Sequence, residues 1–159
     1  MKFKDWNGKE YDLPKGKQFS WRPSAYALIT KEDKVLLIKA RQHGRWELPG
    51  GGIELGELVT DGLIREVFEE TGYKIKLENN CPVYFENNFF YAPDINDFFE
   101  TLPLVFLAKL ESINQIKSYI DFENEVYEIK WVPLNELHKF ELQPISLQAI
   151  KQLDITKKS

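Results

Sequence analysis

A glycine-rich loop followed at once by a strong helical pattern constrains the fold of this chain more than any other feature. The stretch LPGGGIELGELVTDGLIREVFEETGY runs from Leu48 to Tyr73. Within it, Val59, Leu63 and Val67 recur four residues apart and form one apolar stripe. This spacing predicts an amphipathic helix over residues 57–71.

Strand-length runs lie on both sides of this helix. Residues 24–30 and 34–40 are apolar and are separated by the turn-like KEDK, which predicts a hairpin. Further strands are predicted at residues 74–80, 82–93, 102–110 and 128–134, with a polar loop near residues 94–101 and a second helix at residues 144–153. Strands around a long helix, followed by a terminal helix, indicate an α/β (α+β) fold in which a mixed β-sheet is sandwiched between helices.

Length and composition indicate one globular domain. The 159 residues are enough to bury a sizeable core, so we expect a single domain over residues 1–159, with residues 1–20 packed on it as an N-terminal extension. Hydrophobic residues make up 43% of the chain and charged residues 29%, which is ordinary for a soluble protein. The formal net charge of -4 argues against broad, non-specific binding to nucleic acid or to an anionic membrane.

Cysteine usage and hydropathy favour a cytoplasmic location. Cys81 is the only cysteine, so the chain can form neither an intramolecular disulfide nor a cysteine metal cluster. The opening residues MKFKDWNGKEYDLPKGK lack an apolar core of signal-peptide length. No apolar run approaches the length that spans a membrane, so we expect no membrane association.

The predicted helix carries an unusual concentration of carboxylates. Glu66 and Glu70 lie one turn apart and point the same way, with Glu69 beside Glu70, and Arg65 can reach Glu69. Oxygen ligands at this density suit Mg²⁺ or Mn²⁺, and the preceding glycines let the backbone approach a metal or a phosphate closely. The alternative is a solvated acidic helix face, which is what an isolated pair of glutamates usually forms.

The spacing of the whole segment favours the metal site. Gly51 is followed by five residues, Glu57, seven residues and then REVFEETGY from Arg65 to Tyr73. This resembles the signature box of the Nudix hydrolases, G-x5-E-x7-R-E-U-x-E-E-x-G-U, where U is a bulky aliphatic residue. All seven fixed letters are present, a match expected by chance on the order of once in 10⁸ starting points. Tyr73 replaces the last aliphatic residue, and the resemblance covers about residues 22–153.

The resemblance implies an enzyme that cleaves a nucleoside diphosphate linked to another moiety, with Mg²⁺ or Mn²⁺ as cofactor. The implied metal ligands are the three helix glutamates and one backbone carbonyl of the loop: Glu66, Glu69, Glu70 and the carbonyl near Gly50 or Gly51. Arg65 and Glu57 match the residues that brace these glutamates. Bound metal would bridge phosphate oxygens and lower the pKa of the attacking water.

The general base has several candidates. In the family it is a glutamate whose location varies, inside the box or on a later loop. Here DFENEV precedes the strand predicted at residues 128–134, and Glu125 is the first candidate, followed by Glu123 and Glu128. The alternative is that these are ordinary charges at a strand entrance.

Basic and aromatic residues near the box are candidates for substrate contacts. Arg41 and Arg45 flank the loop before the box, where a phosphate could be met, although each alone could be a solvated charge. Tyr91 lies at the edge of the window in which the dinucleoside polyphosphate type carries a tyrosine, and otherwise packs in an aromatic cluster. His43 and His138 have no ligand-spaced partners, so we expect both to be surface or loop residues.

The resemblance leaves the substrate class open among nucleoside triphosphates, nucleotide sugars and dinucleoside polyphosphates. An RNA 5′-end pyrophosphohydrolase is an alternative that the acidic charge balance disfavours. A non-catalytic nucleotide-sensing module is another, which the intact box disfavours. The isomerase branch needs a catalytic cysteine, and no motif around Cys81 supports one. We therefore expect a small-molecule nucleotide as the partner, and a homodimer is possible because family members are often dimers.

Overall fold

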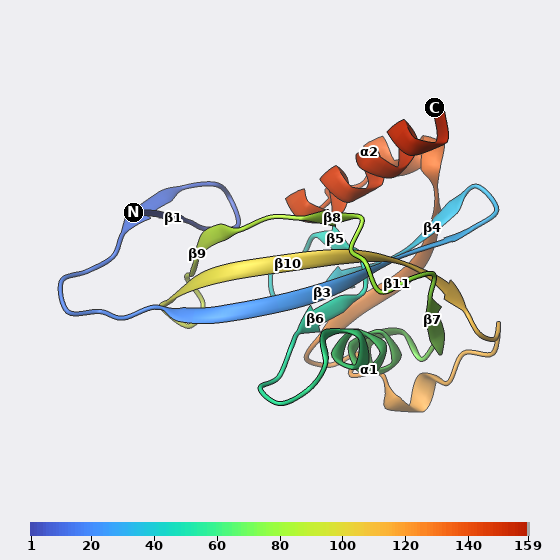
Figure 1. The fold of residues 1–159 in the computed structure, drawn as a ribbon, viewed down its shortest axis with the longest axis horizontal. Coiled ribbons are helices and arrows are strands. Elements are labelled where there is room, and N and C mark those ends of the chain that lie inside the picture. The colour runs from blue at the N-terminus through green and yellow to red at the C-terminus, as the bar shows by residue number, and fades with distance from the viewer. Residues whose placement is uncertain (159) are drawn as a thin grey trace.

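A long, curved, mixed β-sheet lies between two helices. The computed structural model describes the backbone of residues 1–158 and the side chains of residues 1–153. Helix α1 (Val59–Thr71) lies against one face of the sheet and α2 (Pro144–Lys158) against the other (Figure 1). The predicted α/β (α+β) class, with a mixed sheet between helices, is confirmed. None of the described helices is long and apolar enough to cross a membrane.

Eleven strands within the described residues belong to this sheet. They are β1 (Lys2–Lys4), β2 (Glu10–Asp12), β3 (Ser20–Lys31), β4 (Lys34–Ala40), β5 (Trp46–Glu47), β6 (Gly50–Gly52), β7 (Ile75–Leu77), β8 (Tyr84–Phe85), β9 (Asn88–Ala92), β10 (Asp97–Leu110) and β11 (Val126–Pro133). The main strand order is β11-β4-β3-β10-β9-β1-β2, while β5 pairs with β4, β6 with β3, and both β7 and β8 with β10. Two 3₁₀ helices, η1 (Lys117–Tyr119) and η2 (Leu134–Lys139), flank β11.

The centre of the sheet is the long parallel pair β3 and β10, which runs from Phe99 opposite Ser20 to Ala108 opposite Ile29. The predicted hairpin between β3 and β4 is confirmed, with Lys31 opposite Lys34. Two-residue hairpin loops require positive φ, and Glu32 in this turn has a φ of 54°.

Two predicted strand boundaries were wrong. Residues 94–101 were expected to form a polar loop, but β10 starts at Asp97 and the turn is limited to residues 93–96. Phe98 and Phe99 lie on opposite faces of the strand and are both buried, so their packing outweighs the polar composition of this segment. The single strand expected at residues 82–93 is divided into β8 and β9.

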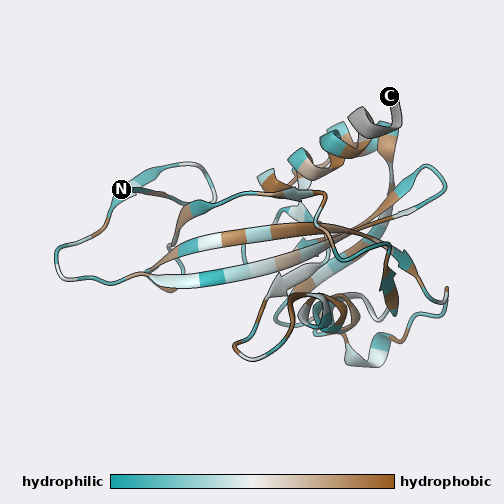
Figure 2. Cartoon of the chain, in the orientation of Figure 1, coloured by the Kyte–Doolittle hydropathy of each residue, from teal (hydrophilic) through white to brown (hydrophobic). Residues whose placement is uncertain are grey.

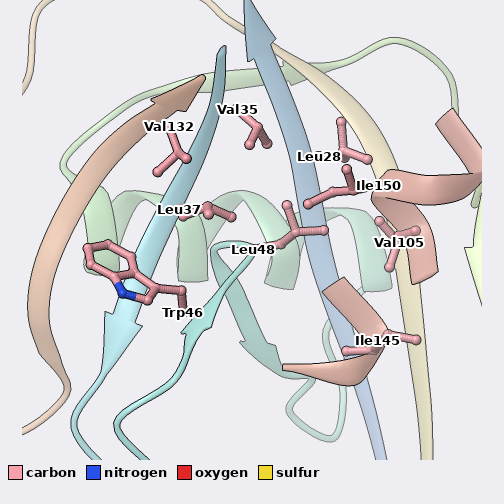
Figure 3. Close-up of a cluster of buried hydrophobic side chains, with 10 residues drawn as sticks. Leu28, Val35, Leu37, Trp46, Leu48, Val105, Val132, Ile145 and Ile150 are labelled. Carbon is pink, nitrogen blue, oxygen red and sulfur yellow. The ribbon is translucent and has the colours of Figure 1, made fainter. Parts of the chain in front are cut away.

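Apolar side chains fill both faces of the sheet. On β4, Val35 and Leu37 point toward α2, whereas Leu36 points toward α1. Figure 3 shows Val35 and Leu37 in one buried cluster with Ile145 and Ile150 of α2. Because β4 is buried on both sides, its sequence is a continuous apolar run rather than an alternating one. Each such side chain contributes about 1.5–3 kcal/mol through burial. Figure 2 shows hydrophobic residues along the middle of β10, because this strand is also buried on both faces.

Helix α1 is held by packing on one side and by its termination at Gly72. Leu63 and Val67 are fully buried. Gly72 adopts a φ of 69° and donates its N–H to the carbonyl of Phe68 at 2.8 Å. A Cβ at Gly72 would lie 2.3 Å from the carbonyl oxygen of Ile116, so both the backbone conformation and the close approach require glycine. The helix starts at Val59, two residues after the expected residue 57.

Residues 1–19 add a small hairpin to the far edge of the sheet. Strand β1 pairs with β2 and lies parallel to β9, with Lys4 opposite Phe90. Phe3 is fully buried and makes edge contacts with Phe19, Phe89 and Phe98 at centroid distances of 5.6, 5.3 and 5.0 Å. Aromatic packing therefore attaches this segment to β9 and β10.

Candidate active site

The glycine loop and α1 meet at Glu70. Gly50 lies on β6 opposite Tyr26 and has a φ of 147°, and a Cβ there would lie 2.1 Å from the carbonyl oxygen of Ala25. Only glycine fits this position. The Gly50 N–H donates to the carboxylate of Glu70 at 2.8 Å. The loop therefore fixes one oxygen of a glutamate that comes from the helix.

Gly51 makes room for a second carboxylate. A Cβ at Gly51 would lie 2.5 Å from Oε2 of Glu66. The Glu66 side chain is 20% exposed, so its carboxylate occupies a partly enclosed position against the loop backbone. The loop and the helix thus bring two carboxylates and the Gly50–Gly51 backbone together, as the box resemblance predicts.

Arg65 connects the other acidic residues of the box. Its guanidinium donates to both carboxylate oxygens of Glu57, at 2.7 Å from Nη2 and 3.2 Å from Nε. Its Nη1 donates to Glu66 at 2.8 Å and to Glu69 at 3.1 Å. Charge-assisted bonds of this kind hold side chains in defined directions. The contacts agree with the bracing role proposed for Arg65 and Glu57.

Glu57 is itself held on two sides. Besides Arg65, it accepts the backbone N–H of Glu54 at 2.7 Å, and these hydrogen bonds lower the pKa of its carboxyl. A Cβ at Gly62 would lie 2.6 Å from Oε1 of Glu57. Glycine in the first turn of α1 therefore lets the Glu57 side chain cross this turn and reach Arg65.

Burial and neighbouring negative charges raise the pKa of the two inner carboxylates, Glu66 and Glu70. Desolvation raises the pKa of Glu70 well above its ordinary value, the charge of Glu47 raises it further, and the hydrogen bond from Gly50 opposes the rise. Desolvation also raises the pKa of Glu66, which the hydrogen bond from Arg65 opposes. Several carboxylates at close range favour their neutral forms unless a positive charge joins them.

The donor chemistry of this cluster fits a hard divalent cation. The candidate ligands are carboxylate oxygens and backbone carbonyls, which are the donors that Mg²⁺ and Mn²⁺ prefer. Arg65 binds one oxygen of Glu66 and one of Glu69. Across the part of the chain that the structure describes, no three acidic, histidine or cysteine side chains are already gathered at metal-ligand spacing.

Among the predicted bases, Glu125 lies near the cluster. Its charge raises the pKa of both Glu66 and Glu70. Its backbone carbonyl accepts the N–H of Arg41 at 3.0 Å, which ties the loop before β11 to the end of β4. The third candidate, Glu128, forms an ion pair in which its carboxylate oxygen lies 3.3 Å from Nζ of Lys130.

The three predicted substrate contacts lie in different places. Arg41 is exposed beside the Glu125 loop, where it donates to the Phe122 carbonyl at 2.6 Å and lies 5.1 Å from the ring of Tyr127. Arg45 instead donates to Glu141 at 3.0 Å, and also to the side chain of Asn7 and the carbonyl of Trp6.

Tyr91 takes part in packing at the far end of the sheet. Its hydroxyl donates to Asn96 at 3.0 Å, and its ring lies 4.4 Å from Tyr11 and 4.6 Å from Phe98. Of the three predicted contacts, Arg41 is therefore the one that lies beside the Glu125 loop.

Two residues of the site were missed by the sequence reasoning. Glu47 was not considered, although its charge acts on Glu70. His43 lies in a loop, as expected, but its side chain is only 4% exposed and its Nε2 lies 3.3 Å from a carboxylate oxygen of Glu47, a contact that the sequence did not indicate. The available signal was the segment WE before the glycines, in which Trp46 enters the core and Glu47 must take the opposite face of the strand.

Comparisons with known proteins identify the family and the fold. The NUDIX domain family model matches residues 20–153. A MutT-like protein from Streptomyces ambofaciens is 40% identical over 62 residues, which are 38% of this chain and 40% of that protein. An ADP-ribose pyrophosphatase from Methanocaldococcus jannaschii is 30% identical over 115 residues, which are 70% of this chain and 62% of that protein. The chain thus spans less than two thirds of the length of either relative.

The fold is shared with a NUDIX hydrolase from Nitrosomonas europaea. That structure superposes with a TM-score of 0.70 at 21% identity and covers 86% of this chain and 90% of its own. The match at residues 20–153 includes the glycine loop, all of α1 and the Glu125 loop. The chain belongs to the Nudix hydrolase superfamily.

Proposed function

We propose that this protein hydrolyses a pyrophosphate bond in a nucleoside diphosphate that is linked to another moiety. The observation that carries the proposal is the meeting of Glu66 and Glu70 with the Gly50–Gly51 backbone, with the charge of Glu125 near both carboxylates. A site of this kind repels a diphosphate unless it holds cations, and its oxygen donors suit Mg²⁺ or Mn²⁺.

The residues that would hold the metal are those of the predicted set: Glu66, Glu69, Glu70 and the backbone carbonyl of Gly51. When bound, Mg²⁺ or Mn²⁺ would neutralise phosphate charge and acidify a coordinated water. Arg65 and Glu57 keep the helix carboxylates in place before the substrate arrives, so little reorganisation is needed during the reaction.

Glu125 is our proposed general base. Its carboxylate would accept a proton from the attacking water as the water oxygen bonds to phosphorus and the bridging P–O bond breaks. Arg41, whose backbone N–H donates to the carbonyl of Glu125, is our proposed contact to a phosphate of the substrate. We propose no substrate role for Arg45 or Tyr91, because both are engaged in contacts within the protein.

The family resemblance leaves three substrate classes open. We propose a nucleoside triphosphate, a nucleotide sugar or a dinucleoside polyphosphate, and the relative named as an ADP-ribose pyrophosphatase adds ADP-ribose to the compounds worth testing. The net charge of -4 favours a small nucleotide over the 5′ end of an RNA.

A phosphate-release assay over these compounds, with Mg²⁺ at mildly alkaline pH and a phosphatase to reveal newly exposed phosphates, tests the proposal. We expect hydrolysis of one class that is lost in Glu70→Gln. Glu125→Gln should lower kcat by about 10²–10⁴-fold, as removal of a general base does. Glu123→Gln, in the same loop, serves as the matched control. Hydrolysis of no compound, or full activity in Glu70→Gln, would overturn the proposed function.

A further inference from the structure

His43 is enclosed and has both ring nitrogens engaged. The backbone N–H of Arg45 donates to its Nδ1 at 3.1 Å, and its Nε2 lies 3.3 Å from a carboxylate oxygen of Glu47. A nitrogen that accepts a hydrogen bond carries no proton, so the proton of the neutral ring is on Nε2 and faces Glu47. The loop backbone thereby selects the tautomer that donates to the carboxylate.

Glu47 lies where the acidic site begins. It is opposite Ile38 on β4 and three residues before Gly50, whose N–H binds Glu70. Its side chain is 12% exposed. Trp46 enters the cluster on the α2 side, so Glu47, the next residue of β5, faces the side of the sheet that carries α1 and Glu70. In agreement with this placement, desolvation and then the charge of Glu47 raise the pKa of Glu70. Each of the two neighbouring carboxylates thus has one fixed donor, His43 for Glu47 and Gly50 for Glu70.

The N-terminal segment covers His43. The ring of Trp6 lies 4.5 Å from the His43 ring and 4.3 Å from the ring of Phe90 on β9. Arg45 fastens the same loop to the segment through the carbonyl of Trp6 and the side chain of Asn7. Trp6 lies outside residues 20–153, the part that the family model matches.

We propose that Glu47 is a further acidic residue of the cation site, and that His43 and Trp6 are positioning residues that fix the direction of its carboxylate. The proposal rests on the proposed function for the identity of the site. A carboxylate held beside Glu70 increases the negative charge that a divalent cation meets, and so increases its affinity. The segment before residue 20 therefore contributes to the site, although it supplies none of the box residues.

Titration of Mn²⁺ into the metal-free protein, followed by electron paramagnetic resonance, tests this without turnover. Loss of a residue that orients a ligand typically weakens metal affinity about 10–100-fold. We expect a loss of this size in Glu47→Gln and in His43→Leu, and a smaller loss in Trp6→Ala. His43→Gln should recover most of the affinity, because its amide N–H can donate to Glu47 from nearly the same position.

His138→Leu is the matched control, because this second histidine is exposed on η2. It should bind Mn²⁺ like the wild type. Equal affinity in Glu47→Gln and the wild type would overturn the proposal, and so would equal losses in His43→Leu and His43→Gln. If His43→Leu does not fold, Glu47→Gln decides alone.

The outcome is separable from that of the proposed function. Wild-type protein that binds Mn²⁺ but hydrolyses no nucleotide would refute the enzymatic proposal, and the Glu47 variant would still decide the inference through affinity. Wild-type protein that binds no Mn²⁺ would overturn both.

Discussion

Gly50 and Gly51 are adjacent in the chain but are needed for different reasons. A side chain at Gly50 would meet the backbone of Ala25 and Tyr26, at 2.1 and 2.7 Å. At Gly51, the three atoms nearest to an added Cβ all belong to the carboxylate of Glu66, the first at 2.5 Å. The first position is therefore required by the fold, and the second by the site.

This difference predicts opposite phenotypes for two alanine variants. Gly50→Ala should lose about 1–3 kcal/mol of unfolding free energy from its backbone conformation alone, and more from the clash. Gly51→Ala should keep most of its stability and lose metal affinity, because Glu66 must swing away. Urea denaturation and Mn²⁺ titration measure the two effects, and equal stabilities for the two variants would contradict the distinction.

The pH dependence of the unfolding free energy tests whether the pKa of Glu70 is raised in the folded protein. A carboxyl whose pKa is higher in the folded than in the unfolded protein binds more protons when folded, so its stabilising contribution is lost as pH rises. In EDTA, we expect the unfolding free energy to fall as pH rises from about 4.5, the ordinary value for glutamate, through the folded pKa of Glu70. Urea titrations at several pH values measure this.

Glu70→Gln is the control for that experiment, since glutamine cannot titrate. It should remove a large part of the decline, and the remainder comes from Glu66, whose pKa is also raised. A divalent cation should reverse the decline, because it favours the charged carboxylates. An identical pH profile in wild type and Glu70→Gln would show that folding does not raise the pKa of Glu70.

At the scale of elements, the loop and α1 act as one unit joined by Arg65. One guanidinium binds Glu57 before the helix and Glu66 and Glu69 within it. Lysine keeps the charge but cannot reproduce the forked contact with Glu57. Arg65→Lys should therefore lower Mn²⁺ affinity about 10–100-fold.

The same variant should lose only about 1 kcal/mol of stability, because Arg65 is partly exposed and solvent screens its ion pairs. Thermal unfolding checks the stability, and Lys130→Arg, at an exposed pair with Glu128, is the reciprocal control. A large stability loss with unchanged metal affinity would mean that Arg65 serves the fold rather than the site.

Local pattern predicted the elements that depend on local interactions. The helix over 57–71 and the hairpin joining β3 and β4 follow from apolar spacing and a short polar turn, and the box spacing located Glu57, Arg65 and the helix glutamates. The start of β10 was missed because Asp97 and Glu100 suggest a loop, while Phe98 and Phe99 are buried only through pairing with distant strands. Composition cannot show such pairing.

The positions of Glu47 and His43 could not be predicted for the same reason. Glu47 reaches the site through the pairing of β5 with β4, and His43 is buried by Trp6, which lies 37 residues earlier in the chain. Both facts depend on strand pairing and on contacts between distant parts of the chain, which a single sequence does not predict. Glu125 was the first of three candidate bases in the sequence, and only the fold brings its charge near Glu66 and Glu70.

At the scale of the whole molecule, residues 1–19 are attached through a buried aromatic cluster around Phe3. If this segment and the rest of the chain form one cooperative domain, removing the packing of Phe3 should lower the free energy of unfolding of the whole domain. Phe3→Ala should therefore lower the unfolding free energy by about 3–5 kcal/mol, within a single transition.

Phe85→Ala is the matched control for size, since Phe85 is 62% exposed. It should cost less than about 1 kcal/mol. Urea denaturation followed by both far-ultraviolet circular dichroism and tryptophan fluorescence measures both variants. Two separate transitions in Phe3→Ala, or no destabilisation, would indicate that the N-terminal segment folds apart from the sheet.

The most direct test of the central claim is the rate of nucleotide hydrolysis as a function of Mg²⁺ concentration, in wild type and Glu70→Gln side by side. We predict no turnover in EDTA, saturable activation of the wild type by Mg²⁺, and no recovery of wild-type turnover in the variant at any Mg²⁺ concentration. Turnover that persists in EDTA, or that is the same in both proteins, would contradict the claim that this acidic cluster works by holding a divalent cation.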